Sequence, residues 1–124
     1  MKKLFRVLPG IGGDFVVAPQ FPDLDLEEII ASGIVLGGPI LLKKGRASRC
    51  HENASQLWKN RKHGIVGVGT GYALSDDGLW RQHSWGILRE GVLETTQERI
   101  KYFGLVLTGA RADGFAKIEG TRSA

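Results

Sequence analysis

The chain has 124 residues, of which 42% are hydrophobic and 24% charged, with a formal net charge of +4. This length and composition predict one globular domain over residues 1–124, with no room for a second. No apolar run approaches the roughly 20 residues that a membrane-spanning helix needs, and a single cysteine excludes an internal disulfide. We therefore expect a cytoplasmic protein without a membrane partner.

The excess of basic residues favours acidic partners only weakly. Its densest groups, at residues 43–46 and 59–62, are short and contain no aromatic residues on which bases could stack. A solvated basic face is therefore the preferred interpretation, and a nucleic-acid partner is the weaker alternative.

Proline and glycine dominate the first residues of the chain, and residues 1–22 are predicted to form an irregular arm. The basic opening is typical of a signal peptide, but Arg6 and Pro9 interrupt it and no cleavage site follows. A short helix should then run through Leu26 and Ile29, with Asp23 or Asp25 as its cap and Gly33 as its end.

Two apolar runs follow, at residues 34–36 and 40–42, separated by Gly-Gly-Pro. They have the length of strands, and we expect them to line a groove rather than to join the main sheet.

A central helix is predicted over residues 49–61, with Ser48 as its N-cap and Gly64 after its end. One apolar stripe recurs at helical spacing, and it consists of Cys50, Ala54, Leu57 and Trp58. This stripe places Cys50 on the core side of the first turn.

Four strands are predicted after the helix, over residues 65–74, 79–88, 92–96 and 104–108, and residues 109–124 are predicted to be a frayed tail. The fold class is therefore α+β, with the cysteine-bearing helix packed on an antiparallel meander of about four strands.

Cys50, His83 and Glu94 occur in the order of a nucleophile, a base and a residue that orients the base. A thiol at a helix N-terminus beside an imidazole has a lowered pKa. The register of the predicted hairpin decides the role of Glu94. If Leu88 pairs with Gly91 around a two-residue turn, Glu94 and His83 share a face, whereas a bulge at Gly91 would turn Glu94 away.

These residues resemble a known family. The pattern comprises Cys50-x-x-x-Ala54-x-x-Leu57, Gly64-Ile65, Gly71-Tyr72, His83-x-Trp85 and Gly91-x-x-Glu94-x-Thr96. It resembles the transglutaminase-like core of the papain-like cysteine peptidase superfamily over residues 48–108. The resemblance implies a papain-like fold with Cys50 as nucleophile, His83 as base and Glu94, where the family usually has Asp, as the orienting carboxylate. Thr96 is the alternative to Glu94 in that last role.

The expected function is that of a small cysteine-dependent hydrolase or acyl-transferase acting on an amide or ester bond of a peptide or protein substrate. Candidate substrate-binding or oxyanion-binding residues are Arg49, Asn53, Trp85 and Thr96. No cofactor is expected, and no metal, because the chain lacks a C-x-x-C pair. The alternative is a catalytically inactive papain-like binding module for a protein or peptide partner.

Overall fold

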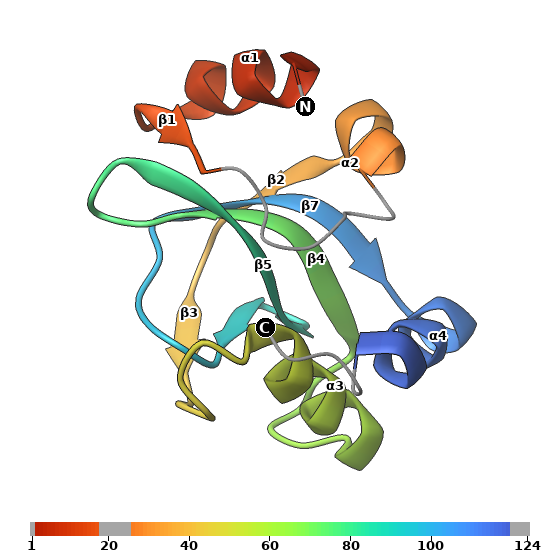
Figure 1. The fold of residues 1–124 in the computed structure, drawn as a ribbon. Coiled ribbons are helices and arrows are strands. Elements are labelled where there is room, and N and C mark those ends of the chain that lie inside the picture. The colour runs from red at the N-terminus through yellow and green to blue at the C-terminus, as the bar shows by residue number, and fades with distance from the viewer. Residues whose placement is uncertain (1, 18–25, 120–124) are drawn as a thin grey trace.

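The computed structural model describes residues 2–17 and 26–119, and this part of the chain is an α+β fold of four helices around a curled mixed sheet (Figure 1). The helices are α1 (Lys2–Ile11), α2 (Leu26–Ser32), α3 (Cys50–Asn60) and α4 (Gly109–Glu119). The strands are β1 (Phe15–Val16), β2 (Ile34–Leu36), β3 (Ile40–Leu42), β4 (Gly67–Leu74), β5 (Leu79–Leu88), β6 (Gly91–Glu94) and β7 (Lys101–Leu107). No helix in these ranges is long and apolar enough to span a bilayer.

The sheet has the strand order β2-β7-β4-β5-β6-β3, and β1 pairs with β5. The four predicted strands are present as β4 to β7, but they do not form a simple meander. β7 returns to lie beside β4, which gives the 4-1-2-3 order of a Greek key. Gly71 of β4 lies opposite Gly104 of β7, and a Cβ on either residue would collide with the backbone of the other strand. This close approach favours the β4–β7 pairing.

The expectation that residues 34–36 and 40–42 line a groove outside the main sheet is wrong. They form β2 and β3, which pair with β7 and β6 at the two ends of the strand order. The intervening Gly-Gly-Pro turn separates two strands that join opposite edges. Ile34 and Val35 are both exposed, as are Ile40 and Leu41. Because successive side chains of a strand point to opposite faces, neither face of these two edge strands is covered at these positions.

The prediction of an irregular N-terminal arm is wrong for residues 2–11, which form α1 with Pro9 inside it. Leu8 is fully buried in the core, and the end of the helix is held by two side chains from distant strands. Lys101 donates to the carbonyl of Ile11, and the indole of Trp80 donates to that of Gly12. Tertiary contacts thus stabilise a helix that its composition disfavours.

The short helix expected near Leu26 is confirmed as α2, with Ile29 buried and Gly33 after its last residue. The predicted caps Asp23 and Asp25, like residues 18–22 of the predicted arm, lie outside the described ranges.

The prediction of a frayed tail after residue 108 is wrong for Gly109–Glu119, which form α4. Ala112, Phe115 and Ala116 are buried at helical spacing, and Asp113 accepts a hydrogen bond of 2.9 Å from the indole of Trp58. The helix forms because this apolar stripe packs against α3.

Two apolar clusters fill the molecule. The larger one joins all four helices to the sheet and includes Trp58, Tyr72, Trp80 and Phe115. The smaller one lies within the sheet and consists of Ala73, Trp85, Ile87, Val92 and Tyr102, with Leu36 packed against it. The sheet is curled (Figure 1). Side chains of β4, β5, β6 and β7 meet in the second cluster.

Candidate active site

Cys50 is the first residue of α3 and is 8% exposed. The N-cap residue is Arg49 rather than the predicted Ser48. Ser48 lies one residue before the cap and has a left-handed backbone conformation, with a φ of 59°. The side chain of Arg49 makes no capping hydrogen bond at this end of the helix. The first N–H groups of a helix have no intrahelical carbonyl partner, so the N–H groups of this turn lie beside the thiol as potential oxyanion donors. The rest of the predicted stripe faces the core as expected, with Ala54 and Trp58 buried and Leu57 half-buried.

The N-terminus of α3 meets β5 at an open stretch of that strand. β6 pairs with β5 only from Gly86 to Leu88, and β1 pairs with it only at Leu79 and Trp80. Between these stretches α3 contacts side chains from both faces of β5. His51 Nδ1 lies 2.6 Å from Ser84 Oγ on one face, and the Cys50 thiol hydrogen-bonds to His83 on the other.

The hairpin has the register in which His83 and Glu94 share a face. Leu88 pairs with Gly91 and Ile87 with Val92, around a two-residue turn and without a bulge. His83 Nε2 lies 2.8 Å from Glu94 Oε1 and 3.0 Å from Oε2, and both side chains are almost completely buried. Because Nε2 donates to Glu94, the ring nitrogen left for the thiol is Nδ1.

The Glu94 carboxylate is surrounded by hydrogen-bond donors. Besides His83, it accepts bonds from the Tyr102 hydroxyl at 2.8 Å, from the N–H groups of Thr95 and Thr96 at 3.1 and 3.0 Å, and from the Thr96 hydroxyl at 3.0 Å. A buried carboxylate is stable only when its oxygens are paired in this way. Thr96 therefore holds Glu94 and does not contact His83 in its place.

The electrostatics follow from these contacts. Burial raises the pKa of the Cys50 thiol, but the charge of His83 and the hydrogen bonds with His51 and His83 outweigh it and hold that pKa well below its usual range. Burial lowers the pKa of His83, whereas the charge of Cys50 and the hydrogen bonds with Cys50 and Glu94 raise it to about 8. At neutral pH these directions favour a thiolate beside an imidazolium.

The same contacts shift the pKa values of Glu94 and Tyr102. Burial raises the pKa of Glu94, but the hydrogen bond and the charge of His83, together with the bonds from Thr96 and Tyr102, lower it to about 2. Burial and then the charge of Glu94 raise the pKa of Tyr102 above its usual range, so this hydroxyl keeps its proton and donates.

Two other residues predicted to bind substrate, Asn53 and Arg49, bond to the loop before α3 and to its first turn. Asn53 is buried, accepts from the N–H of Arg46 at 3.1 Å and donates to its carbonyl at 2.8 Å, so its amide anchors the loop before α3. Arg49 is half-buried and forms an ion pair with Glu52 at 3.3 Å. These contacts tie both side chains to the first turn of α3 and to the loop before it.

Trp85 is fully buried rather than exposed in a pocket. Its ring lies 4.8 Å from that of Tyr102 and 6.1 Å from that of His83, measured between centroids. The indole therefore packs behind the imidazole and fixes its position. Gly69 lies opposite Trp85, and a Cβ there would collide with the indole.

Three residues at the site were not assigned to it from the sequence. Tyr102 was missed because the fourth strand was predicted to begin at residue 104, although aromatic residues at 102 and 103 are typical of a strand. His51 and Ser84 follow Cys50 and His83 directly in the chain, but their contact across α3 and β5 depends on tertiary packing. Ser84 in turn bonds to Thr70 Oγ1 at 3.2 Å.

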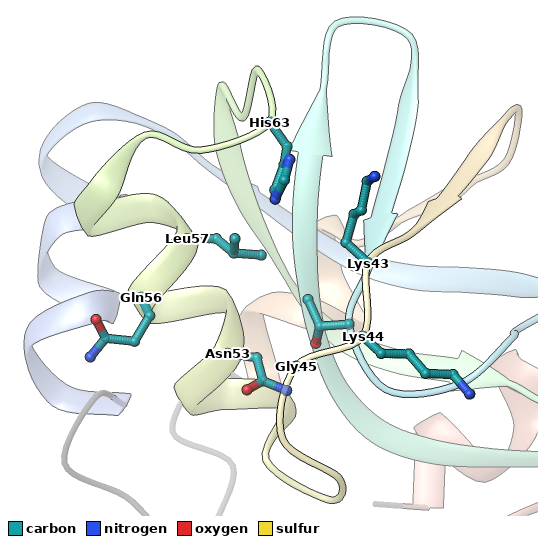
Figure 2. A pocket seen from close by; sticks show the side chains of 8 residues that line it. Lys43, Lys44, Gly45, Asn53, Gln56, Leu57 and His63 are labelled. Carbon is teal, nitrogen blue, oxygen red and sulfur yellow. The ribbon is translucent and has the colours of Figure 1, made fainter.

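Two cavities flank the loop that leads into α3. One of about 360 Å³ lies between this loop and the side of α3, and it is lined by Lys43, Lys44, Gly45, Asn53, Gln56, Leu57, His63 and Thr95 (Figure 2). The other, of about 170 Å³, is lined by Ala47, Ser48, Thr96, Gln97 and Arg99. Within residues 2–17 and 26–119, no group of three or more His, Cys, Asp or Glu side chains could hold a metal ion.

Comparison with known proteins gives no family assignment: no family model, no curated protein and no solved structure matches this chain.

Proposed function

We propose that the protein is a cysteine-dependent hydrolase or acyl-transferase that acts on an amide or ester bond through Cys50, His83 and Glu94. The observation that carries this proposal is the continuous chain of contacts from the Cys50 thiol through His83 to the buried Glu94 carboxylate. Nucleophile, base and orienting group are joined in the order that acyl transfer requires. The sequence resemblance to the transglutaminase-like core supports the same assignment, and a papain-like origin of the fold is part of the proposal.

The reaction would proceed in two steps. The Cys50 thiolate attacks the carbonyl carbon, and the oxyanion that forms accepts hydrogen bonds from the first N–H groups of α3. His83, as imidazolium, gives its proton to the leaving amine or alcohol, which leaves a thioester on Cys50. A water molecule or an amine then gives a proton to the neutral imidazole and attacks the thioester carbonyl. The C–S bond breaks and the Cys50 thiolate leaves, which restores the thiolate–imidazolium pair.

Glu94 holds the imidazole through Nε2 and stabilises its cationic form. Its own proton affinity is too low for it to take the proton, since its pKa is about 2. Tyr102 and Thr96 keep the carboxylate oriented toward His83. These residues would thus act on the reaction through His83.

A second candidate is a binding module that has kept the fold without the reaction. The low exposure of Cys50, 8%, favours it, because a nucleophile must be reached by its substrate. The contact of the thiol with His83 disfavours it, since a protein without catalysis has no need of that geometry.

Labelling of the thiol tests both candidates, and Cys50 is the only cysteine in the chain, so every adduct reports on it. At pH 6 a free thiol is less than about 1% ionised. We expect iodoacetamide to label Cys50 at least about tenfold faster than N-acetylcysteine at this pH, and His83→Asn to remove most of the advantage. We further expect p-nitrophenyl acetate to leave one acetyl group on the protein, detected by mass, and Cys50→Ala to abolish the adduct. A thiol that reacts no faster than N-acetylcysteine and takes no acetyl group would support the binding module instead.

A further inference from the structure

We propose that the cavity of about 360 Å³ between α3 and the loop that leads into it is a substrate subsite that binds the carboxylate side chain of an acidic residue in a peptide. This inference rests on the proposed function, because it assigns the substrate class of the same site. It also predicts peptide binding that can be measured without any reaction at Cys50.

The first support is the position of the cavity relative to the catalytic residues. Its lining residue Thr95 directly follows Glu94, and Asn53 lies about one turn beyond Cys50 on α3. The loop that forms its other wall is bonded to the same strand. Lys43 N–H donates to the Glu94 carbonyl at 2.9 Å, and Gly45 N–H donates to that of Thr95 at 2.7 Å. A peptide held at Cys50 would therefore have a neighbouring side chain within reach of the cavity.

The second support is its charge. Its ionisable lining side chains are Lys43, Lys44 and His63, and no carboxylate is among its lining residues. Figure 2 shows Lys43 and His63 on the two sides of its upper end, whereas Lys44 extends away from α3. Within the described ranges, no ion pair uses Lys43 or Lys44, so their charges are not already neutralised.

The third support is an unsatisfied hydroxyl. Thr95 is 1% exposed, and its Oγ1 has no hydrogen-bond partner in the described part of the chain. A ligand acceptor that reached this hydroxyl from the cavity would supply the missing hydrogen bond. The amide of Asn53 is occupied on both sides by Arg46, so the remaining polar groups are chiefly donors.

These features match one ligand chemistry. A cavity with cationic and neutral donors binds an anionic acceptor, and Leu57 with Gly45 offers an apolar wall for the methylene groups of Glu or Asp. A volume of about 360 Å³ accommodates one such side chain with part of its backbone. The absence of Phe, Tyr and Trp from the lining disfavours a stacked nucleobase.

The test is an amide NMR titration of the full chain with three capped tetrapeptides that differ only in Glu, Gln or Lys at one central position. We expect the Glu peptide to shift the amides of Gly45, His63 and Thr95 saturably. It should bind at least about fivefold more tightly than the Gln peptide, as a partly desolvated charge pair with a hydrogen bond provides. Equal affinity for the Glu and Gln peptides, or no saturable shift, would overturn the inference.

Variants of the lining residues and competing anions test the same inference further. Lys43→Gln and Thr95→Val should each reduce the Glu-over-Gln preference at least about twofold. Lys59→Gln, the same charge change on α3 outside the cavity, should leave it unchanged. Saturation of the same amides by inorganic phosphate or a single-stranded oligonucleotide, as tight as by the Glu peptide, would overturn the peptide assignment. Repeating the titration with Cys50→Ala separates the two proposals, because binding there is independent of the thiol and an unreactive Cys50 would contradict only the proposed function.

Discussion

Glu94 is the residue on which the geometry of the site depends most. It is fully buried, and its two oxygens accept hydrogen bonds from two side chains and two N–H groups in addition to His83. A neutral amide could not replace it, because the NH₂ group of an amide would face donors where the carboxylate offers acceptors.

At this scale we predict that Glu94→Gln lowers the free energy of unfolding by about 3 kcal/mol, because it leaves buried donors unpaired. Tyr102→Phe removes a single hydroxyl from the same network and should cost about 1 kcal/mol. Urea denaturation at pH 7 measures both. Equal losses for the two variants would contradict a role for the charge of Glu94, because Tyr102→Phe removes one hydrogen bond and leaves that charge in place.

At the scale of elements, the site is assembled where the edge of β5 that faces away from β4 has no paired strand, between its short pairings with β6 and β1. α3 enters this opening with its N-terminus, and its first two residues reach opposite faces of the same strand. Trp85 then supports His83 from within the curled sheet, and it can do so because Gly69 on β4 has no side chain. A Cβ at Gly67 or Gly71 of the same strand would collide with the backbone of β7.

We accordingly predict that Gly69→Ala lowers the free energy of unfolding by about 3 kcal/mol, because the new methyl group collides with a fully buried indole. Gly114→Ala is the matched control. Gly114 lies inside α4 with open space around its Cβ position, and the substitution should stabilise the protein by about 0.5–1 kcal/mol. Thermal denaturation followed by circular dichroism measures both, and a neutral Gly69→Ala would contradict the packing described for Trp85.

At the scale of the whole molecule, buried charge makes the fold sensitive to acid. The pKa of Glu94 is about 2 in the folded protein, below its usual value of 4.5. A folded-state pKa below the unfolded one contributes stability that is present above the unfolded pKa and is lost as the pH falls. For Glu94 the loss therefore extends from about pH 4.5 down to about pH 2.

We predict that the free energy of unfolding falls by about 3 kcal/mol over this interval through Glu94 alone. Other carboxylates with lowered pKa values, such as Asp77 and Glu28, are exposed and are common to the wild type and a Glu94→Gln variant. The difference between the two proteins, measured by denaturation at several pH values, isolates Glu94. A difference that stays constant from pH 5 to pH 2 would contradict the lowered pKa.

Elements with local signals could be predicted from the amino-acid sequence alone. Helical spacing located α3 and its apolar stripe, turn residues separated β4 from β5, and the two-residue turn after Leu88 permitted the register that joins His83 to Glu94. The order of Cys50, His83 and Glu94 along the chain likewise needed no structure to suggest a shared site.

How these elements pack together could be seen only in the folded structure. α1 contains Pro9 and depends on contacts from β5 and β7, the runs at residues 34–36 and 40–42 join opposite edges of the sheet, and Tyr102 reaches Glu94 because the sheet curls. Periodicity records which side of an element is apolar, but it does not record which distant element covers that side. Strand order and side-chain networks depend on contacts between residues far apart in the chain, and their free energy has no local signature in the sequence.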